Sequence, residues 1–282
     1  MSARAHHYAG RFAPSPTGPL HFGSLVAAVG SWLDARAHGG RWYVRMEDVD
    51  EPRCVPGAAD GILRTLERFG LKWDGEVLTQ SRRTHMYKDA LERLRRDGRA
   101  FGCSCTRRDL SGERYNGACR NGPAQGRAPR AWRFRVPSEA VVFHDRRLGR
   151  FEERLEESCG DVVVLRADGY FAYQLAVVVD DAAQGITDVV RGADLLDSTA
   201  RQIALHRALG HAPPDHLHLP VATNEQGQKL SKQTKAAPLD PARAEELTHI
   251  ALQFLGVRVE TGSLEAMLGE AKMKWSLMFP KS

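Results

Sequence analysis

The sequence lacks a long apolar run, because no segment approaches the roughly 20 consecutive apolar residues that cross a bilayer. Its first residues, Met-Ser-Ala-Arg-Ala-His-His-Tyr, contain no apolar core of the kind found in secretory signal peptides. Internal repeats and low-complexity tracts are also missing. We therefore expect a cytoplasmic protein that has no membrane partner. We also expect a monomer.

Cysteine is scarce as well, with five residues in the chain. The odd count argues against a disulfide framework and favours either a metal site or plain burial in a reducing compartment. Three of the five are clustered between residues 103 and 119. Cys54 and Cys159 are isolated, and we predict that both are ordinary buried or half-buried residues.

The 282 residues can bury a sizeable core and form one large domain or two small ones. The net charge of +5 permits binding to nucleic acid without proving it. Arginines crowd one segment, at Arg107, Arg108, Arg114, Arg120, Arg127, Arg130, Arg133 and Arg135, followed by Arg146, Arg147 and Arg150. This segment is either a solvated insertion or an RNA phosphate contact, to which the planar guanidinium is well suited.

Strand and helix signals alternate over residues 10–100. Residues 41–47 are typical of a buried strand, and residues 59–69 and 85–96 carry apolar positions at helical spacing. This order predicts a parallel sheet, whose ligands bind beyond the carboxyl ends of the strands.

From Phe101 to about Val136 the periodicity disappears, which indicates an insertion. Regular patterning returns over 161–165 and 173–181, with another strand over 186–191, a helix over 200–209 and a helical tail after Pro241.

The most informative segment runs from Arg11 to Ser24, Arg-Phe-Ala-Pro-Ser-Pro-Thr-Gly-Pro-Leu-His-Phe-Gly-Ser. It predicts a short strand, a stiff Pro/Gly turn and a helix start, with Gly18 and Gly23 permitting close approach of a ligand. Backbone N–H groups and the helix dipole make such a helix start an anion site. His21 stands at this site and could donate to a phosphate.

Two motifs in this order resemble the signatures of class I aminoacyl-tRNA synthetases. His21-Phe-Gly-Ser24 resembles the His-Ile-Gly-His motif, and Lys229-Leu-Ser-Lys-Gln233 resembles the Lys-Met-Ser-Lys-Ser loop. The residues that precede the first motif, from Arg11 to Gly18, resemble more specifically the glutamyl-tRNA synthetases within this class.

The resemblance implies a set of site residues. His21 and Lys232 would be catalytic, and ATP with Mg²⁺ would contact His21, Gly23, Ser24, Lys229, Ser231 and Lys232. Glutamate would contact Arg11, Phe12, Ala13, Pro14, Ser15, Glu47, Tyr173 and Arg191, with Glu47 on its ammonium group. Alternatives remain open: His21 as a satisfied turn residue, Lys232 as a solvated side chain, Tyr173 as core packing and Arg191 in a surface ion pair with Asp188 or Asp194.

Cys103, Cys105 and Cys119 can converge on one Zn²⁺, which prefers tetrahedral sulfur and nitrogen ligands. No histidine lies in this segment, so the fourth ligand is a hydroxyl, a water or a distant residue, and the resemblance points to Tyr115. The alternative is three reduced buried thiols. A zinc ion here would have a structural role.

We expect that the chain lacks the helical anticodon-binding part that glutamyl-tRNA synthetases carry, which would make it similar to the glutamyl-queuosine tRNA(Asp) synthetase family. This similarity implies an α/β Rossmann-type parallel sheet in two halves, over 1–100 and 161–240, a zinc-bearing insertion over 101–160 and a helical C-terminal extension over 241–282. It also implies tRNA-independent activation of L-glutamate by ATP and transfer to the queuosine of tRNA(Asp). A shortened synthetase charging a tRNA 3′ end and a non-catalytic glutamate- or RNA-binding paralogue are the alternatives.

Overall fold

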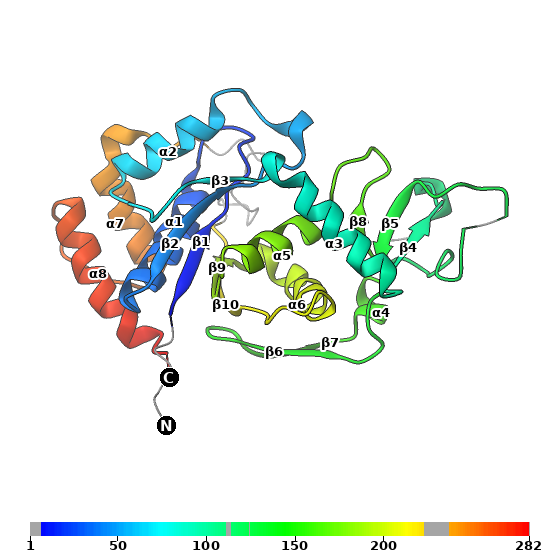
Figure 1. The fold of residues 1–282 in the computed structure, drawn as a ribbon. Helices are drawn as coiled ribbons and strands as arrows, with labels where there is room; N and C mark the ends of the chain where they lie inside the picture. The colour runs from blue at the N-terminus through cyan, green and yellow to red at the C-terminus, as the bar shows by residue number, and fades with distance from the viewer. Residues whose placement is uncertain (1–6, 111–113, 124, 223–236, 282) are drawn as a thin grey trace.

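The first half of the chain forms a parallel sheet connected by helices (Figure 1). The structure, a computed structural model, describes residues 7–110, 114–123, 125–222 and 237–281. Strand β1 (Ala9–Phe12) pairs in parallel with β2 (Arg41–Met46), which pairs in parallel with β3 (Leu78–Thr79). Helices α1 (Phe22–Ala37) and α2 (Ala58–Arg68) make the connections between these strands.

A second sheet, parallel except for its edge strand β7, continues the first at the edge formed by β1. Strand β9 (Asp188–Gly192) pairs with β10 (Asp215–Leu219), and β10 pairs with β6 (Val141–Asp145), whose hairpin partner is β7 (Gly149–Glu153). The Thr187 amide donates to the Ala9 carbonyl at 2.9 Å, which places β9 beside β1. The strand order therefore reverses between β1 and β9, and a ligand crevice is expected at the carboxyl ends of these two strands.

The remaining strands form an antiparallel sheet in a separate lobe, at the right of Figure 1. It contains β4 (Ala100–Cys103), β5 (Ala131–Phe134) and β8 (Val162–Leu165). Strand β8 lies just beyond the insertion expected over 101–160, whereas β6 lies inside that range and extends the parallel sheet through β10. The domain boundaries therefore remain a proposal.

The other helices are α3 (Thr84–Arg96), α4 (Leu155–Ser158), α5 (Tyr173–Ala183), α6 (Thr199–Ala208), α7 (Ala244–Phe254) and α8 (Leu264–Met278). Short 3-10 turns occupy Glu51–Arg53, Gln80–Arg83, Arg107–Asp109, Ala193–Ser198 and Pro241–Arg243. None of the helices in the described part of the chain has the length and apolar character needed to cross a bilayer.

Helices α7 and α8 pack on α1 and hold it from the side opposite the second half of the sheet (Figure 1). The fully buried Asp34 of α1 accepts hydrogen bonds from Trp275 Nε1 at 2.8 Å, Tyr8 Oη at 2.5 Å and Arg146 Nη1 at 2.6 Å. Because these donors come from α8, the N-terminal segment and the β6–β7 turn, one buried carboxylate ties three distant segments to α1.

Most of the predicted elements are confirmed, including the strand at 41–47, the helices at 59–69, 85–96 and 200–209, and the helical tail. The grouping of residues 173–181 with strands is wrong, because these residues form α5. Residues Leu175 to Asp181 of this helix are all buried. A helix buried on every side has no polar face, so its apolar run cannot be distinguished from that of a buried strand.

Candidate functional site

A cavity of about 730 Å³ opens at the carboxyl ends of β1 and β9, where the strand order reverses. It is lined by every predicted ATP- or glutamate-binding residue that the structure describes: Arg11, Phe12, Ala13, Pro14, Ser15, His21, Gly23, Ser24, Glu47, Tyr173 and Arg191. Lys229, Ser231 and Lys232 lie outside the described residues. The described chain nevertheless reaches this cavity on both sides of that gap, since Ala222 lines it and Pro238 forms a β-bridge with His21.

The turn between β1 and α1 places His21 at the start of the helix. Gly18 has a φ of 136°, in the region that favours glycine, which lets the chain reverse ahead of α1. His21 is the N-cap of α1, and its Nδ1 accepts a hydrogen bond from the Ser24 amide at 3.3 Å. A neutral imidazole that accepts at Nδ1 carries its proton on Nε2, so the cap selects the tautomer that can donate at Nε2.

A buried charge cluster lies beneath the cavity. Asp181 of α5 accepts from Arg11 at 3.1 Å and from Arg45 at 2.8 Å, and Arg45 also donates to Glu47 at 3.1 Å. Burial raises the pKa of Asp181, but the two guanidinium groups outweigh it and lower that pKa well below its usual range. The net charge that Arg11 presents to a ligand is therefore reduced by Asp181.

Glu47 follows β2 directly and is positioned by its backbone amide, which donates to the Pro14 carbonyl at 2.9 Å. Burial raises the pKa of Glu47, and the nearby Arg45 and Arg11 oppose this shift. Tyr173, the first residue of α5, lines the same cavity, and burial raises the pKa of its hydroxyl. Its phenol is thus kept in the protonated form that can donate to an anion.

Arg191 differs from the other buried arginines of the site in having only neutral partners. Its Nε donates to His218 Nε2 at 3.1 Å, its Nη1 to Gln202 Oε1 at 2.7 Å and its Nη2 to Thr199 Oγ1 at 2.9 Å. Within the described residues it forms no ion pair, and it is 5% exposed. The alternative of a surface ion pair is therefore wrong, and burial lowers the pKa of this unneutralised guanidinium.

Sequence reasoning did not predict the residues that support these side chains. Asp181 follows Asp180 in a valine-rich run, and two adjacent acids in an apolar segment were the available signal. His218 and Asp145 gave no comparable signal, because they lie 73 residues apart and meet only where β10 pairs with β6.

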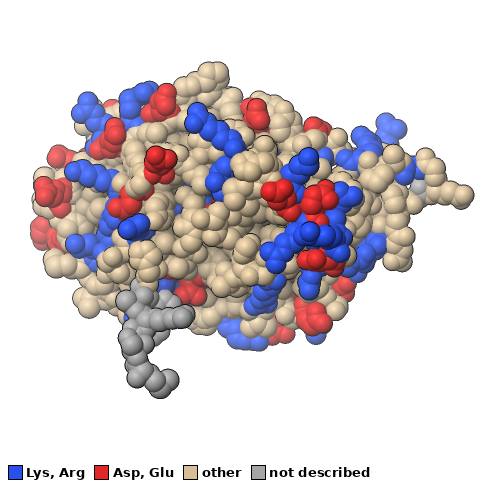
Figure 2. Space-filling model, viewed as in Figure 1, with Lys and Arg blue, Asp and Glu red and all other residues tan. Residues whose placement is uncertain are grey.

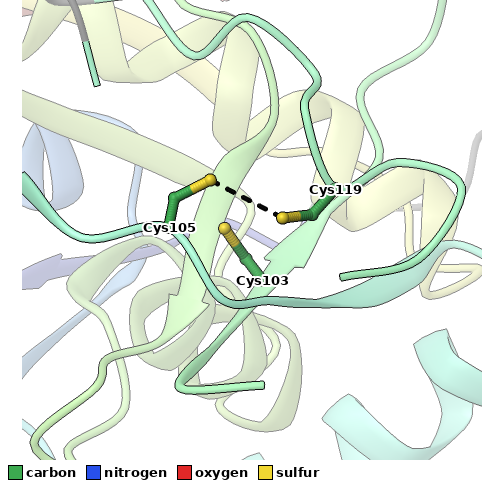
Figure 3. A group of neighbouring side chains, drawn as sticks. All are labelled: Cys103, Cys105 and Cys119. Carbon is green, nitrogen blue, oxygen red and sulfur yellow. Dashed lines mark hydrogen bonds between the residues drawn. The ribbon is translucent and has the colours of Figure 1, made fainter. Parts of the chain in front are cut away.

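The three clustered cysteines lie in the lobe, and their sulfur atoms point toward one another (Figure 3). All three Sγ atoms lie within 4.8 Å of one another, and Cys105 Sγ is 3.6 Å from Cys119 Sγ. Tyr115 Oη donates to Cys103 Sγ at 3.6 Å and accepts from the Cys119 amide at 2.8 Å. The cluster could hold a metal ion such as zinc, because three thiols lie close enough together to bind one ion.

A cation lies next to the cluster. Arg133 Nε donates to Cys103 Sγ at 3.4 Å, and its guanidinium lies 3.8 Å from the centre of the Tyr115 ring. Burial raises the pKa of Cys119, but hydrogen bonds involving Ser104, Cys105 and Tyr115 reverse this and lower it to about 6. Burial and the hydrogen bonds with Cys119 and Cys103 raise the pKa of Cys105 to about 11. The donor set fits a divalent ion because three sulfur atoms lie within 4.8 Å of one another and thiols bind such an ion in their deprotonated form. Cys54 and Cys159 are half-buried and free, as expected.

The arginine-rich segment divides into buried and exposed members. Arg120 pairs with Asp161 and Glu156, Arg133 supports the cysteines, and Arg146 pairs with Asp34. The exposed members are Arg108, Arg114, Arg127, Arg130, Arg147 and Arg150. Figure 2 shows positive side chains gathered around α3 and the lobe, with acidic side chains among them. Part of the segment is thus structural, and only the exposed arginines remain available to RNA.

The chain is similar in sequence to known proteins over most of its length. Residues 9–252 match the family described as "tRNA synthetases class I (E and Q), catalytic domain". The glutamyl-Q tRNA(Asp) synthetase of Chromobacterium violaceum is 55% identical over 96% of this chain and 94% of its own length. That of Dechloromonas aromatica is 59% identical over 88% of this chain and 86% of its own length.

The fold resembles that of a solved glutamate-tRNA synthetase from Elizabethkingia anophelis, with a TM-score of 0.77 and 26% identity. The match covers 95% of this chain and 66% of that structure. The residues matched by the family model include β1, α1 and β9, which border the cavity. The chain is therefore an enzyme of the class I tRNA synthetases and belongs to the family of glutamyl-Q tRNA(Asp) synthetases.

Proposed function

We propose that this enzyme activates L-glutamate with ATP, without requiring tRNA, and transfers the glutamyl group to the cyclopentenediol of queuosine in tRNA(Asp). The observation that carries the proposal is the buried Arg191, which faces the same cavity as Glu47 and has no carboxylate partner among the described residues. The names of the relatives, which contain glutamyl-Q and tRNA(Asp), support the identity of the acceptor.

Two of the three charged groups of glutamate would bind at opposite charges of the cavity. Arg191 would hold the side-chain carboxylate, because a buried cation without a counterion gains most from an arriving anion. Glu47 would hold the ammonium group, and Tyr173 and Ser15 would donate hydrogen bonds. Phe12, Ala13 and Pro14 would shape the wall, and Arg11 would add positive charge that Asp181 moderates.

In the first step, an oxygen of the glutamate α-carboxylate would attack the α-phosphorus of ATP. The bond from that phosphorus to the bridging oxygen breaks, and pyrophosphate leaves with the bonding electrons. His21 would donate from Nε2 to the phosphate oxygens at the start of α1, where the helix dipole also favours negative charge. Gly23 and Ser24 would bind ATP beside it, with Lys229, Ser231 and Lys232 completing the ATP site, while Mg²⁺ would accompany the nucleotide.

In the second step, a hydroxyl of the queuosine ring would attack the activated carbonyl carbon and displace AMP. The mixed anhydride is already reactive, so the step needs mainly positioning. One structural zinc ion on Cys103, Cys105, Cys119 and Tyr115 would stabilise the lobe against which the tRNA lies, with the exposed arginines contacting its phosphates.

The test is transfer of labelled glutamate, with ATP, to tRNA(Asp) that carries or lacks queuosine. The proposal predicts label only on the queuosine-bearing tRNA, and that label should survive periodate oxidation of the 3′ ribose. Label on tRNA(Glu) that is lost after the same treatment would identify a shortened synthetase instead. Absence of glutamate-dependent pyrophosphate exchange would identify a non-catalytic paralogue.

A further inference from the structure

A buried chain of hydrogen bonds runs from the β6–β7 turn to Arg191, outside the residues assigned to the reaction. Asp145, the last residue of β6, is fully buried, and its Oδ2 accepts from His218 Nδ1 at 2.7 Å. His218 Nε2 in turn accepts from Arg191 Nε at 3.1 Å and lies 3.3 Å from Thr199 Oγ1. Three side chains from three different strands are thus linked in series.

The direction of these hydrogen bonds follows from Asp145. Its Oδ1 accepts from the amides of Arg147 and Leu148 at 3.0 and 2.8 Å, and its Oδ2 accepts from the amide of His218 at 3.0 Å. An ionised carboxylate has no proton to donate, so Asp145 can only accept a hydrogen bond from His218 Nδ1. The imidazole proton therefore lies on Nδ1. Nε2 is then an acceptor, as the guanidinium of Arg191 requires.

The arrangement leaves part of the guanidinium available to a ligand. An arginine side chain has five N–H groups, and the three hydrogen bonds to His218, Gln202 and Thr199 use one on each nitrogen. One N–H on each terminal nitrogen therefore has no acceptor among the described side chains. Two such donors match the two oxygens of a carboxylate in a bidentate pair.

We propose that Asp145 and His218 are positioning residues that hold the Arg191 guanidinium for the side-chain carboxylate of glutamate. The inference rests on the proposed function. Asp145 determines the tautomer of His218, and neutral His218 anchors Arg191 without neutralising its charge. A carboxylate in direct contact with Arg191 would instead compete with the substrate for the same cation. This competition explains why Asp145 contacts the imidazole of His218 and not Arg191 itself.

The kinetic test uses pyrophosphate exchange with glutamate and ATP as separately varied substrates. His218→Leu removes the acceptor and should raise the KM for glutamate about 10- to 100-fold, which corresponds to the loss of a hydrogen bond to a charged group. The KM for ATP should stay within about twofold of the wild-type value. His218→Gln retains an acceptor oxygen and should recover much of the loss. Asp145→Asn should act in the same direction as His218→Leu.

His216→Leu is the matched control, because His216 is also buried on β10 and stacks on His218 at 5.9 Å between ring centroids. It makes no hydrogen bond to Arg191, and its glutamate KM should change less than twofold. Equal changes in both KM values for His218→Leu, or an equally large effect of His216→Leu, would overturn the proposal.

The second measurement does not depend on activity. Long-range ¹H–¹⁵N spectra of labelled wild-type protein, with the ring assigned to His218 through its backbone resonances, should show Nδ1 of His218 protonated and Nε2 unprotonated. Protonation at Nε2 would overturn the proposed arrangement even if the variants fail to fold. Wild-type protein without glutamate-dependent exchange would overturn the proposed function, whereas active wild type with unaffected variants would overturn only the positioning role.

Discussion

His21 Nδ1 accepts a hydrogen bond from the backbone amide of Ser24 at 3.3 Å, so the candidate catalytic histidine is also the N-cap of α1. The same side chain therefore begins the helix and orients its own ring. Since the cap occupies Nδ1 as an acceptor, the proton resides on Nε2. The structural and the proposed chemical use of His21 can be separated by substitution.

Replacing His21 should affect stability and activity differently in two variants. Asparagine is a good N-cap, so His21→Asn is expected to keep the free energy of unfolding within about 0.5 kcal/mol, whereas His21→Ala should lose about 1 kcal/mol. Both variants should lower kcat for pyrophosphate exchange about 100- to 1,000-fold, because both lose the Nε2 donor. Urea unfolding and exchange assays test this. Near-normal exchange by His21→Asn would assign His21 a capping role alone.

Replacing Arg191 should change selectivity for the amino acid. Arg191→Met removes the unneutralised guanidinium, and the KM for glutamate should rise at least about 100-fold while the KM for ATP changes little. The preference for glutamate over glutamine should fall in parallel, since glutamine has no side-chain charge to lose. Arg150→Met, which removes an exposed arginine from β7, is the control. Unchanged discrimination in Arg191→Met would place the carboxylate elsewhere in the cavity.

The cysteine cluster should bind metal with a structural effect. Purified protein is expected to contain about one zinc per chain, and Cys119→Ser should lose most of it and lower the melting temperature. Glutamate-dependent pyrophosphate exchange should persist, but transfer to tRNA should decrease, because the cluster lies in the lobe and not in the cavity. Cys159→Ser changes a half-buried cysteine outside the cluster and should retain the metal. Equal zinc content in both variants would contradict this assignment.

Stability should decline on mild acidification because of a buried histidine. Burial lowers the pKa of His206 from 6.5 to about 4, and this side chain is 2% exposed. Between these two pH values the unfolded chain binds a proton that the folded protein excludes, so this stability is present above pH 6.5 and is lost as the pH falls toward 4.

The corresponding loss between pH 7 and pH 5 is about 2 kcal/mol. His206→Gln should therefore show a smaller decrease in the free energy of unfolding over this interval than the wild type, as measured by urea titration at each pH. His85→Gln, which removes an exposed histidine, is the control for the substitution itself. Parallel pH dependence in His206→Gln and wild type would show that His206 does not contribute.

The sequence by itself was sufficient for the features that depend on near neighbours. Proline and glycine between Arg11 and His21 predict the turn and the helix start that follows it, where α1 begins. Alternation of strands and helices predicts the parallel sheet, and therefore the edge at which the cavity lies. The spacing of Cys103, Cys105 and Cys119 likewise indicated one cluster, which the structure brings within bonding reach of a single ion.

Only the tertiary structure decided which charges are neutralised. Arg11 and Arg191 look alike in sequence, yet Asp181 pairs with Arg11 from 170 residues away, while Arg191 has neutral partners only. It also decided that Arg133 and Arg146 are internal and that the valine-rich run is α5. Ion pairing and burial depend on contacts between distant segments, and local patterns of residues contain no information about which segments meet.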